Sequence, residues 1–211
     1  ELFVNTQGGV GGSAPCFAAG TRIATEHGEV AVEDLRVGDR VRTVLDAGTA
    51  PIVWLGQRHA DCAHHPQPRQ VWPVRIEAGA FGPAQPQRDL LLSPDHAVYV
   101  GGALIPVKHL INGTTIAQLP VAQVTYYHLE LAQHDVVLAE GLPAESFLDM
   151  KDGSNYAREP SAAASGAVPL RADWPVQLWE AAGCAPLVVA GPELAAARAL
   201  VAGFATTRQA A

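Results

Sequence analysis

Cys16 is the residue of this sequence best suited to chemistry, because a thiol becomes a strong nucleophile once it loses its proton. It opens the stretch Cys16–Ile23, which reads CFAAGTRI. Far along the chain, the stretch Ser93–His96, SPDH, supplies a hydroxyl group and an imidazole. An adjacent imidazole is the usual means of activating a thiol. The two stretches therefore suggest acyl chemistry at a cysteine, provided that the fold brings Cys16 and His96 together.

The composition limits what such a site could belong to. With 211 residues, of which 48% are hydrophobic and 17% charged, the chain predicts one compact main domain with an appendage. The net charge of -7 and the lack of a Lys/Arg cluster argue against a nucleic-acid partner. Every apolar run is shorter than the roughly 18 residues that a membrane helix needs, so we expect no membrane span. Three widely spaced cysteines, Cys16, Cys62 and Cys184, make a poor disulfide framework and leave at least one thiol free.

The elements that would position the site are short strands. Residues 1–15 are rich in glycine and predict an N-terminal flank or linker. From 16 to about 150, short apolar stretches alternate with Gly, Pro and Asp, which predicts an all-β domain. Residues 151–211 are rich in Ala and Pro and predict a tail with a short helix from Pro192 that frays at Gly203.

An internal repeat supports the β-domain. Residues 32–41 and 107–116 place Val, Leu, Gly and then Val or Ile at identical offsets. Each copy follows a Gly-bearing hairpin and predicts one turn of helix, a glycine stop and a strand. Two copies predict two related halves, with Cys16 entering one and His96 the other. The alternative is that this spacing of Leu and Gly is simply common in turns and that the two segments are unrelated.

Six segments in this order resemble the Hint domain, the hedgehog/intein module, and more closely its bacterial Hint-like group. The segments are Cys16–Ile23, Gly28–Asp39, Trp54–Gly56, Leu90–Val98, Leu104–Gly113 and Tyr127–Phe147. The resemblance covers about residues 16 to 150. It implies a compact, disc-like all-β fold with pseudo-two-fold symmetry, and it favours a secreted or cell-surface bacterial protein.

The resemblance also implies a reaction. In Hint proteins the first cysteine, here Cys16, attacks the carbonyl group of the preceding residue, here Pro15, and converts the peptide bond to a thioester. A Thr-x-x-His segment assists, and Ser93 and His96 stand in its place. The resemblance therefore implies that His96 is the general acid for the departing nitrogen and that the Ser93 hydroxyl fixes the geometry.

A second block of the family lies in Tyr127–Phe147. His128 stands where an Asp is expected, His134 where the first His is expected, and Glu145 and Ser146 stand near the final His-Asn pair. The terminal Asn is missing, which rules out splicing by Asn cyclisation. What remains is single-turnover, peptidase-like self-cleavage of the upstream segment, with water or a small nucleophile as acyl acceptor. We expect a monomer that needs no metal or other cofactor.

Two other functions remain open. The domain could be a catalytically inert Hint-fold module with a structural or interaction role, or a cysteine hydrolase that acts on other molecules. The ring of Pro15 restricts approach to its carbonyl group, which predicts slow chemistry. Taken alone, Cys16 reads as a small buried hydrophobe, His96 as a turn residue, and His128 and His134 as satisfied core residues.

Other reactive side chains are assigned simpler roles. His59, Cys62, His64 and His65 lie within seven residues and could ligate zinc, but they lack paired ligand spacing and lie in a Pro-rich loop. The other expectations are that Asp95 and Glu145 are surface or supporting groups, that Cys184 is buried and inert, and that the four tryptophans serve packing.

Overall fold

The computed structural model describes residues 15–148, 179 and 181–209, and most of these lie in antiparallel strands or their connections. The strands are β1 (Phe17–Ala18), β2 (Arg22–Thr25), β3 (Gly28–Ala31), β4 (Arg40–Arg42), β5 (Thr49–Asp61), β6 (Val74–Ile76), β7 (Leu90–Leu92), β8 (Ala97–Val100), β9 (Ala103–Pro106), β10 (Ile116–Gln118), β11 (Gln123–Leu131), β12 (Val136–Ala139) and β13 (Leu142–Glu145). The 3-10 turns η1 (Val32–Asp34), η2 (Pro68–Gln70) and η3 (Val107–Leu110) and the helix α2 (Pro192–Gln209) complete the described elements. The prediction of an all-β domain followed by a C-terminal helix is confirmed.

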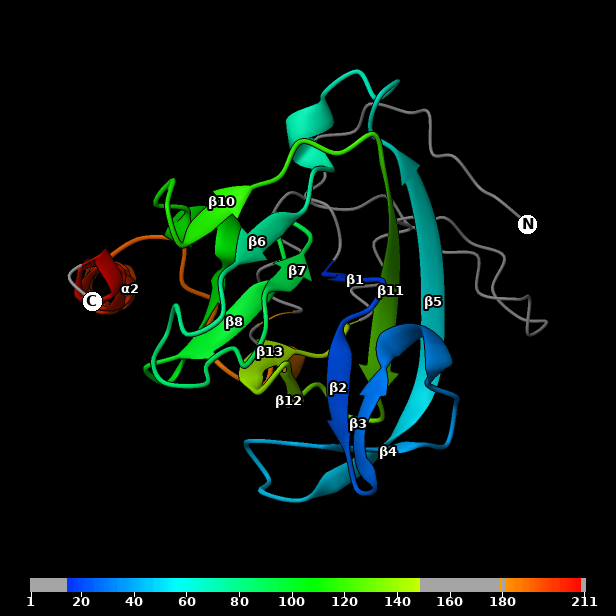
Figure 1. The fold of residues 1–211 in the computed structure, drawn as a ribbon. Helices are drawn as coiled ribbons and strands as arrows, with labels where there is room; N and C mark the ends of the chain where they lie inside the picture. The colour runs from blue at the N-terminus through cyan, green and yellow to red at the C-terminus, as the bar shows by residue number, and fades with distance from the viewer. Residues whose placement is uncertain (1–14, 149–178, 180, 210–211) are drawn as a thin grey trace.

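Strands β5 and β11 form the spine of the sheet. They pair from Gln123 opposite Asp61 to Leu131 opposite Ile52, with an irregularity between Glu130 and Leu131. Figure 1 shows them side by side as two long strands. The order of hydrogen-bonded strands is β10-β6-β7-β1-β11-β5-β4-β2-β12-β13-β8-β9, with β3 on β2. Because β5 pairs with β11 on one edge and β4 on the other, it joins the two halves of the molecule.

The short strand β1 lies at the centre of this arrangement (Figure 1). Phe17 is opposite Tyr127 of β11 on one side and opposite Leu92 of β7 on the other. The side chains of Phe17 and Leu92 are 1% and 0% exposed. Burial of such side chains contributes about 1.5–3 kcal/mol each, so the residue that precedes β1 is held firmly in place.

The internal repeat is confirmed in three dimensions. Turn η1 follows the β2–β3 hairpin and leads to β4, whereas η3 follows the β8–β9 hairpin and leads to β10. Gly38 and Gly113 end the turns with φ angles of 99° and 76°. These angles lie in the left-handed region, where only glycine avoids a steric penalty. Glycine therefore stands at the same offset in both copies because the backbone there adopts a positive φ angle.

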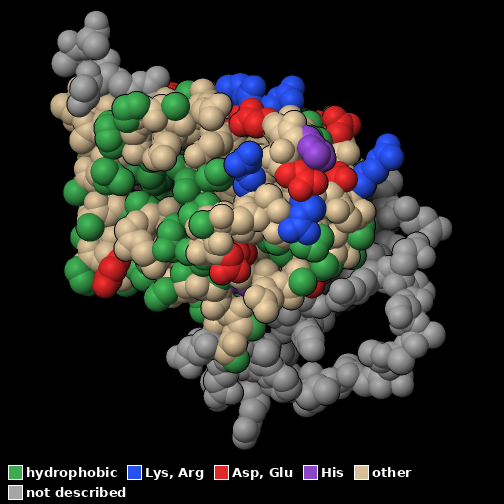
Figure 2. All heavy atoms as spheres, turned by 90° about the horizontal axis from the view of Figure 1, so that it is seen from below, with side chains coloured by type: hydrophobic (Ala, Val, Ile, Leu, Met, Phe, Trp, Pro, Cys, Tyr) green, Lys and Arg blue, Asp and Glu red, His purple; other side chains and the backbone are tan. Residues whose placement is uncertain are grey.

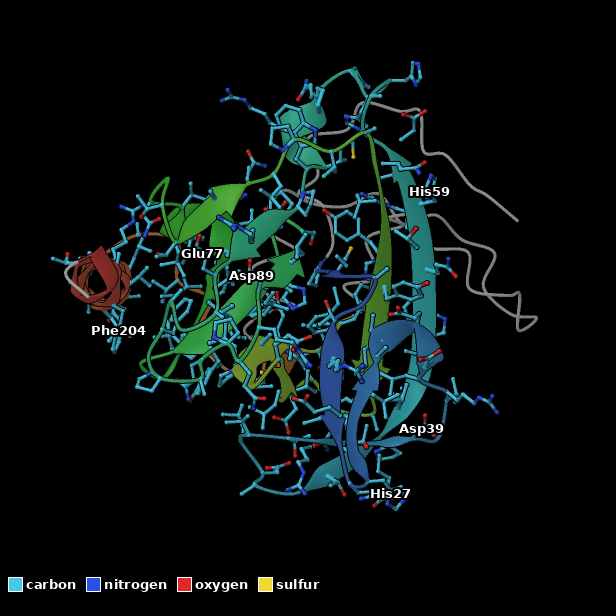
Figure 3. All side chains as sticks on the ribbon, viewed as in Figure 1. His27, Asp39, His59, Glu77, Asp89 and Phe204 are labelled. Atoms are coloured by element: carbon cyan, nitrogen blue, oxygen red, sulfur yellow. The ribbon has the colours of Figure 1, made fainter. Side chains whose placement is uncertain are left out.

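A polar side chain caps each copy of the repeat, although at different positions in the two copies. Asp39 Oδ2 accepts the N–H of Arg36 at 2.8 Å in the first copy, and Asn112 Oδ1 accepts the N–H of Ile116 at 2.9 Å in the second. Figure 3 shows Asp39 near β4, far from the second copy. Asp and Asn are common in such turns because their oxygens satisfy nearby backbone donors.

The helix α2 packs one face onto the β-domain. Leu194, Ala197 and Val201 follow helical spacing, are at most 5% exposed and belong to the main hydrophobic core. Arg198 Nε adds a hydrogen bond of 2.8 Å to the carbonyl oxygen of His109 in η3. The helix continues through Gly203 to Gln209, so the expected fraying at Gly203 is wrong. Packing of the apolar face outweighs the cost of about 1 kcal/mol for a glycine within a helix.

The segment before α2 also joins the β-domain. The N–H of Leu104 in β9 donates to the carbonyl oxygen of Pro186 at 2.9 Å, and the N–H of Val188 returns a bond of 2.8 Å to Leu104. On α2, the ring of Phe204 approaches Gly82, where a Cβ would lie 3.5 Å from it. Figure 3 shows Phe204 on this side of the molecule. Strand-like bonds and apolar contacts thus both hold the C-terminal segment.

Charged side chains of both signs lie together on the surface near the β2–β3 hairpin. Arg40 pairs with Glu26 at 3.6 Å, and Arg88 pairs with Glu29 at 3.0 Å. Figure 2 shows positive and negative side chains intermingled on this face, beside a region of hydrophobic side chains. The arginines here are therefore balanced locally by carboxylates.

Within the described residues, no helix has the length and apolar character needed to cross a membrane. The predicted flank before Pro15 and the predicted linker and domain boundary near residue 150 lie outside the described residues. The division into flank, domain and tail therefore stays a prediction.

Candidate active site

Cys16 is held by a reciprocal pair of hydrogen bonds with Ser93. The N–H of Cys16 donates to Ser93 Oγ at 3.0 Å, and the N–H of Ser93 donates to the carbonyl oxygen of Cys16 at 3.0 Å. Both residues are 0% exposed. The pairing of β1 with β7 explains the contact, because Ser93 follows β7 directly. The amide nitrogen of the Pro15–Cys16 bond is consequently fixed in position.

His128 contacts both partners of the predicted reaction. Its Nε2 atom lies 3.3 Å from Sγ of Cys16, and its Nδ1 atom lies 2.8 Å from the carbonyl oxygen of Pro15. A carbonyl oxygen can only accept, so Nδ1 of a neutral ring must carry the hydrogen. Nε2 then presents its lone pair to the thiol. A single imidazole therefore faces the nucleophile with an acceptor and the electrophile with a donor.

The register of the sheet explains why His128 meets the thiol. Phe17 is opposite Tyr127, so the next step along both strands brings Cys16 beside His128. In β5, the residue opposite His128 is Gly56. A Cβ atom on Gly56 would lie 2.3 Å from the ring of Trp54. The glycine therefore lets the Trp54 indole fold across its own strand.

Aromatic rings enclose His128. The centroid of its ring is 6.2 Å from that of Trp54 and 5.1 Å from that of Phe147, and these two rings are 5.4 Å apart. Burial lowers the pKa of His128 to about 3, although the Pro15 carbonyl group acts in the opposite direction; the positive charge of Arg58 adds to the lowering. His128 is thus neutral near pH 7, as a proton acceptor must be.

His96 lies on the other side of Phe17. The two rings are 4.4 Å apart in an edge-to-face arrangement, and Nε2 of His96 donates to the carbonyl oxygen of Glu145 at 3.2 Å. Nδ1 is buried and has no hydrogen-bond partner among the described residues. Burial lowers the pKa of His96 to about 4, partly opposed by the carbonyl groups of Cys16 and Glu145. In its neutral form His96 carries a lone pair on Nδ1 and must gain a proton there before it can donate one.

His134 is bound in a different environment. Its Nε2 atom donates to the carbonyl oxygen of Ser146 at 3.1 Å, and its Nδ1 atom accepts the N–H of Cys184 at 3.1 Å. The ring of Trp179 lies 5.3 Å away, edge to face. Burial lowers the pKa of His134 to about 4. Both ring nitrogens are thus engaged with the backbone on either side.

Residues 15–151 match the sequence profile of the Hint domain. The chain belongs to the Hint domain family. The predicted fold is thereby confirmed, and family membership implies a general capacity for autoprocessing. The matched region begins one residue before Cys16 and contains Cys16, Ser93, His96, His128 and His134, whereas Trp179 and Cys184 lie beyond its end.

Solved structures similar to this Hint domain include inteins and an intein-like domain. The bacterial intein-like domain of Clostridium thermocellum is 16% identical, with 62% of this chain and 97% of that chain covered and a TM-score of 0.45. A DnaB intein of Synechocystis is 8% identical, covering 64% and 100%, with a TM-score of 0.45. The gp41-1 intein is 11% identical, covering 63% and 98%, with a TM-score of 0.43. The comparison with curated proteins gave no match.

Glu145 is a buried residue of the Hint domain whose environment the sequence did not predict. It was expected to be a surface or supporting group, but it is 3% exposed, so the surface assignment is wrong. Its Oε1 atom accepts the N–H of Ala97 at 2.6 Å, and its Oε2 atom lies 3.7 Å from Nε2 of His134. Burial raises the pKa of Glu145 to about 8. The available signal was its position at the end of an apolar strand, next to Ser146.

The possible zinc ligands of the Hint domain are each engaged elsewhere. His64 Nδ1 lies 2.8 Å from Asp61 Oδ2, His59 Nδ1 lies 3.3 Å from Thr125 Oγ1, and the buried Cys62 thiol points to a backbone carbonyl oxygen. Figure 3 shows His59 near one end of β5. In the described part of the chain, no group of three or more His, Cys, Asp or Glu is arranged to hold a metal ion.

The structure therefore separates the predicted site residues into two groups. Cys16, Ser93 and His128 are in direct contact around the Pro15–Cys16 bond, and His96 is packed against the adjoining Phe17. His134 instead bonds to the chain around Ser146 and to the C-terminal segment. Cys184, which was expected to be buried, is half-buried, and its environment raises the pKa of the thiol to about 12.

Proposed function

We propose that this Hint domain processes its own chain at the Pro15–Cys16 bond through a thioester. The observation that carries the proposal is the position of His128, with Nε2 at the thiol and Nδ1–H at the carbonyl oxygen of Pro15. Nucleophilic catalysis requires a base at the nucleophile and a donor at the developing oxyanion. One side chain supplies both.

The first step forms the carbon–sulfur bond. Nε2 of His128 removes the proton from Cys16 Sγ, and the thiolate attacks the carbonyl carbon of Pro15. Negative charge develops on the carbonyl oxygen as the ring gains its positive charge. The bond from Nδ1–H then becomes charge-assisted, which makes it about twice as strong as a neutral bond. The donor is consequently strongest when the tetrahedral intermediate needs it.

The second step breaks the carbon–nitrogen bond. The nitrogen of Cys16 leaves as an amine and takes up the proton that His128 removed from the thiol. The products are a thioester between Pro15 and Sγ and a free α-amino group on Cys16, so protons and charge balance. Ser93 Oγ, which accepts the amide N–H at 3.0 Å, keeps this nitrogen aligned.

His96 is the general acid in the family-based prediction, and this role is still a prediction. Its Nε2–H is directed to Glu145, so only a second proton, on Nδ1, would allow donation toward Cys16. The lowered pKa makes that doubly protonated form rare at neutral pH. We therefore assign the proton transfer to His128 and a positioning role beside Phe17 to His96.

The fate of the thioester follows from the residues present. Ser146 and Glu145 occupy the region where an intein carries His-Asn, and neither side chain can form the succinimide that Asn forms. Water or a small nucleophile therefore releases the upstream segment, without splicing. An attack on external substrates is disfavoured, because Cys16 and His128 are both 0% exposed. The inert-module alternative is supported by the same burial, which opposes formation of an imidazolium ion.

The test is chemical cleavage of the full chain with hydroxylamine or dithiothreitol, followed by mass spectrometry. We expect two products, one ending at Pro15 and one beginning at Cys16. Cys16→Ala should abolish the reaction, whereas Cys62→Ala, which removes another buried thiol, should leave the site of cleavage unchanged. Cleavage of Cys16→Ala at the same bond would exclude the thioester route. An intact chain in all cases, including Pro15→Gly, would favour the inert module.

A further inference from the structure

The C-terminal segment reaches into the Hint domain at one of its buried histidines. Cys184 donates its N–H to Nδ1 of His134 at 3.1 Å, and Trp179 covers the ring edge to face at 5.3 Å. Neither residue lies within the matched family region, which ends at residue 151. The contact is therefore an addition that this chain makes to the domain.

This contact determines the tautomer of His134. A backbone N–H can only donate, so Nδ1 of His134 must be the acceptor and the ring hydrogen must lie on Nε2. Nε2–H then donates to the carbonyl oxygen of Ser146 at 3.1 Å. Without the Cys184 bond, either nitrogen could carry the hydrogen, and the bond to Ser146 would be lost in one of the two forms.

The adjacent peptide carries the effect toward the cleavage centre. The carbonyl oxygen of Glu145 accepts Nε2–H of His96 at 3.2 Å, one residue before the carbonyl oxygen that binds His134. His96 in turn packs on Phe17, next to Cys16, with ring centroids 4.4 Å apart. Two histidines are thus held by consecutive carbonyl groups of one strand end.

Hydrogen bonds within the C-terminal segment fix its conformation. Trp179 Nε1–H donates to the carbonyl oxygen of Ala185 at 3.0 Å, and the N–H of Gly183 donates to the carbonyl oxygen of Trp179 at 2.7 Å. A Cβ on Gly183 would lie 2.7 Å from that same oxygen. Leu104 then ties the segment to β9 through bonds with Pro186 and Val188. The donor at Cys184 is thereby presented at a fixed place.

We propose that Trp179 and residues 181–188 form a positioning element of the processing centre, which fixes the tautomer of His134 and, through the Glu145–Ser146 peptide, the placement of His96. Its effect on cleavage rests on the proposed function, whereas its effect on the tautomer does not.

The test uses a matched pair of variants in the full chain. Cys184→Pro removes the backbone N–H that binds His134, whereas Cys184→Ala keeps it and removes only the thiol. Ring ¹⁵N shifts measured by NMR report the tautomer of His134. We expect a single Nε2–H form in the unmodified chain and in Cys184→Ala, and a mixture in Cys184→Pro. Thiol-induced cleavage should slow about tenfold in Cys184→Pro alone, in line with the loss of one buried hydrogen bond.

A second variant is needed because the proline in Cys184→Pro could disturb the local fold. Trp179→Phe keeps an aromatic ring at His134 but removes the Nε1–H bond to Ala185, and we expect a smaller change in the same direction. An unchanged tautomer in both Cys184→Pro and Trp179→Phe would overturn the proposal. An unchanged cleavage rate with an altered tautomer would overturn the link to His96. If the unmodified chain does not cleave at all, the proposed function fails while the tautomer measurement still decides the positioning role.

Discussion

His128 bridges Cys16 and Pro15, with its two ring nitrogens 3.3 Å from the thiol and 2.8 Å from the carbonyl oxygen. The two contacts depend on each other, because the hydrogen on Nδ1 leaves Nε2 free to accept. A rotation of the ring would lose both contacts at once. Its rigid enclosure by Trp54 and Phe147 is therefore a condition for the chemistry.

The two functions of His128 can be separated by substitution. His128→Ala should slow cleavage by about 10²–10⁴-fold, because it removes the base and the donor. His128→Asn places an amide N–H near the position of Nδ1 and lacks a base, so we expect an intermediate rate that recovers as pH is raised and the thiol ionises by itself. Cleavage rates from pH 6 to 10, followed by mass spectrometry, measure this. Equal rates for the two variants at all pH values would rule out the donor role.

Three buried histidines predict a loss of stability in acid. Burial lowers the pKa of His96 and His134 to about 4 and that of His128 to about 3, so the unfolded chain binds protons at a higher pH than the folded chain. Their contribution is fully present above the unfolded pKa of about 6.5 and is lost as pH falls toward the folded values. Each histidine contributes a slope of about 1.4 kcal/mol per pH unit within this window.

The measurement is urea unfolding between pH 7 and pH 4.5. The free energy of unfolding should fall as the pH decreases. In His134→Gln its change per pH unit should be smaller, because one fewer histidine takes up a proton on unfolding. His27→Gln is the matched control, because His27 lies on the surface beside Glu26. A slope that is the same in His134→Gln and in the unmodified chain would show that His134 already takes up its proton in the folded state.

Glu145 predicts a pH dependence of opposite sign. Burial raises its pKa from the ordinary 4.5 to about 8, so its protonated form is favoured in the folded chain. The stability that it contributes is present below the unfolded pKa and is lost as pH rises toward 8. Glu145→Gln keeps the oxygen that accepts the Ala97 N–H. The Tm of this variant, relative to that of the unmodified chain, should therefore be higher at pH 8.5 than at pH 5. A constant difference in Tm between the two proteins would contradict an uncharged Glu145.

Gly56 is predicted to be required for the enclosure of His128. Gly56→Ala would bring a Cβ to 2.3 Å from the Trp54 ring and should cost about 1–3 kcal/mol through overpacking. Cleavage should slow as well, since the indole must move away from His128. Gly203→Ala is the control, because no atom of the described residues lies within 4 Å of its Cβ position in α2, and it should stabilise the helix by about 1 kcal/mol. Urea unfolding and tryptophan fluorescence distinguish the two variants.

Pro15 is predicted to limit the rate of the acyl shift. Its ring fixes φ and restricts the approach of the thiol to the carbonyl carbon. Pro15→Gly should therefore accelerate hydroxylamine cleavage before Cys16 and produce no cut near Ser146. Pro51→Gly, at a strand position far along the sequence, serves as the control. A slower reaction in Pro15→Gly would mean that the ring holds the carbonyl group in place for His128 instead of obstructing attack.

The sequence pattern predicted the fold well because its signals are local. Short apolar stretches, hairpin glycines and the offsets around Gly38 and Gly113 report on the backbone directly, and the structure confirms them. The contact between Cys16 and Ser93 follows from two motifs that flank adjoining strands. Both motifs also occur in the order that is expected for the family.

The roles of the histidines were harder to predict because they depend on register and tautomer. The family resemblance implied that His96 is the general acid, whereas the ring beside the thiol belongs to His128, because Cys16 and His128 are each one residue from the pair of Phe17 and Tyr127 in β1 and β11. The hydrogen bond that the buried Glu145 accepts comes from Ala97, and the one that binds His134 comes from Cys184. Both join residues that are far apart in the chain. No periodicity or motif encodes such contacts, so only the folded arrangement reveals them.

The position of Cys16 immediately before β1 also determines what cleavage would leave behind. Cutting the bond before Cys16 severs no strand, so the product keeps the whole sheet intact. The new terminal amine, however, would form at a residue that is 0% exposed, where desolvation opposes its protonation. An uncharged amine beside a thioester can attack it and restore the original peptide bond. The junction would then behave as a reversible latch, which opens for good only when an incoming nucleophile captures the acyl group.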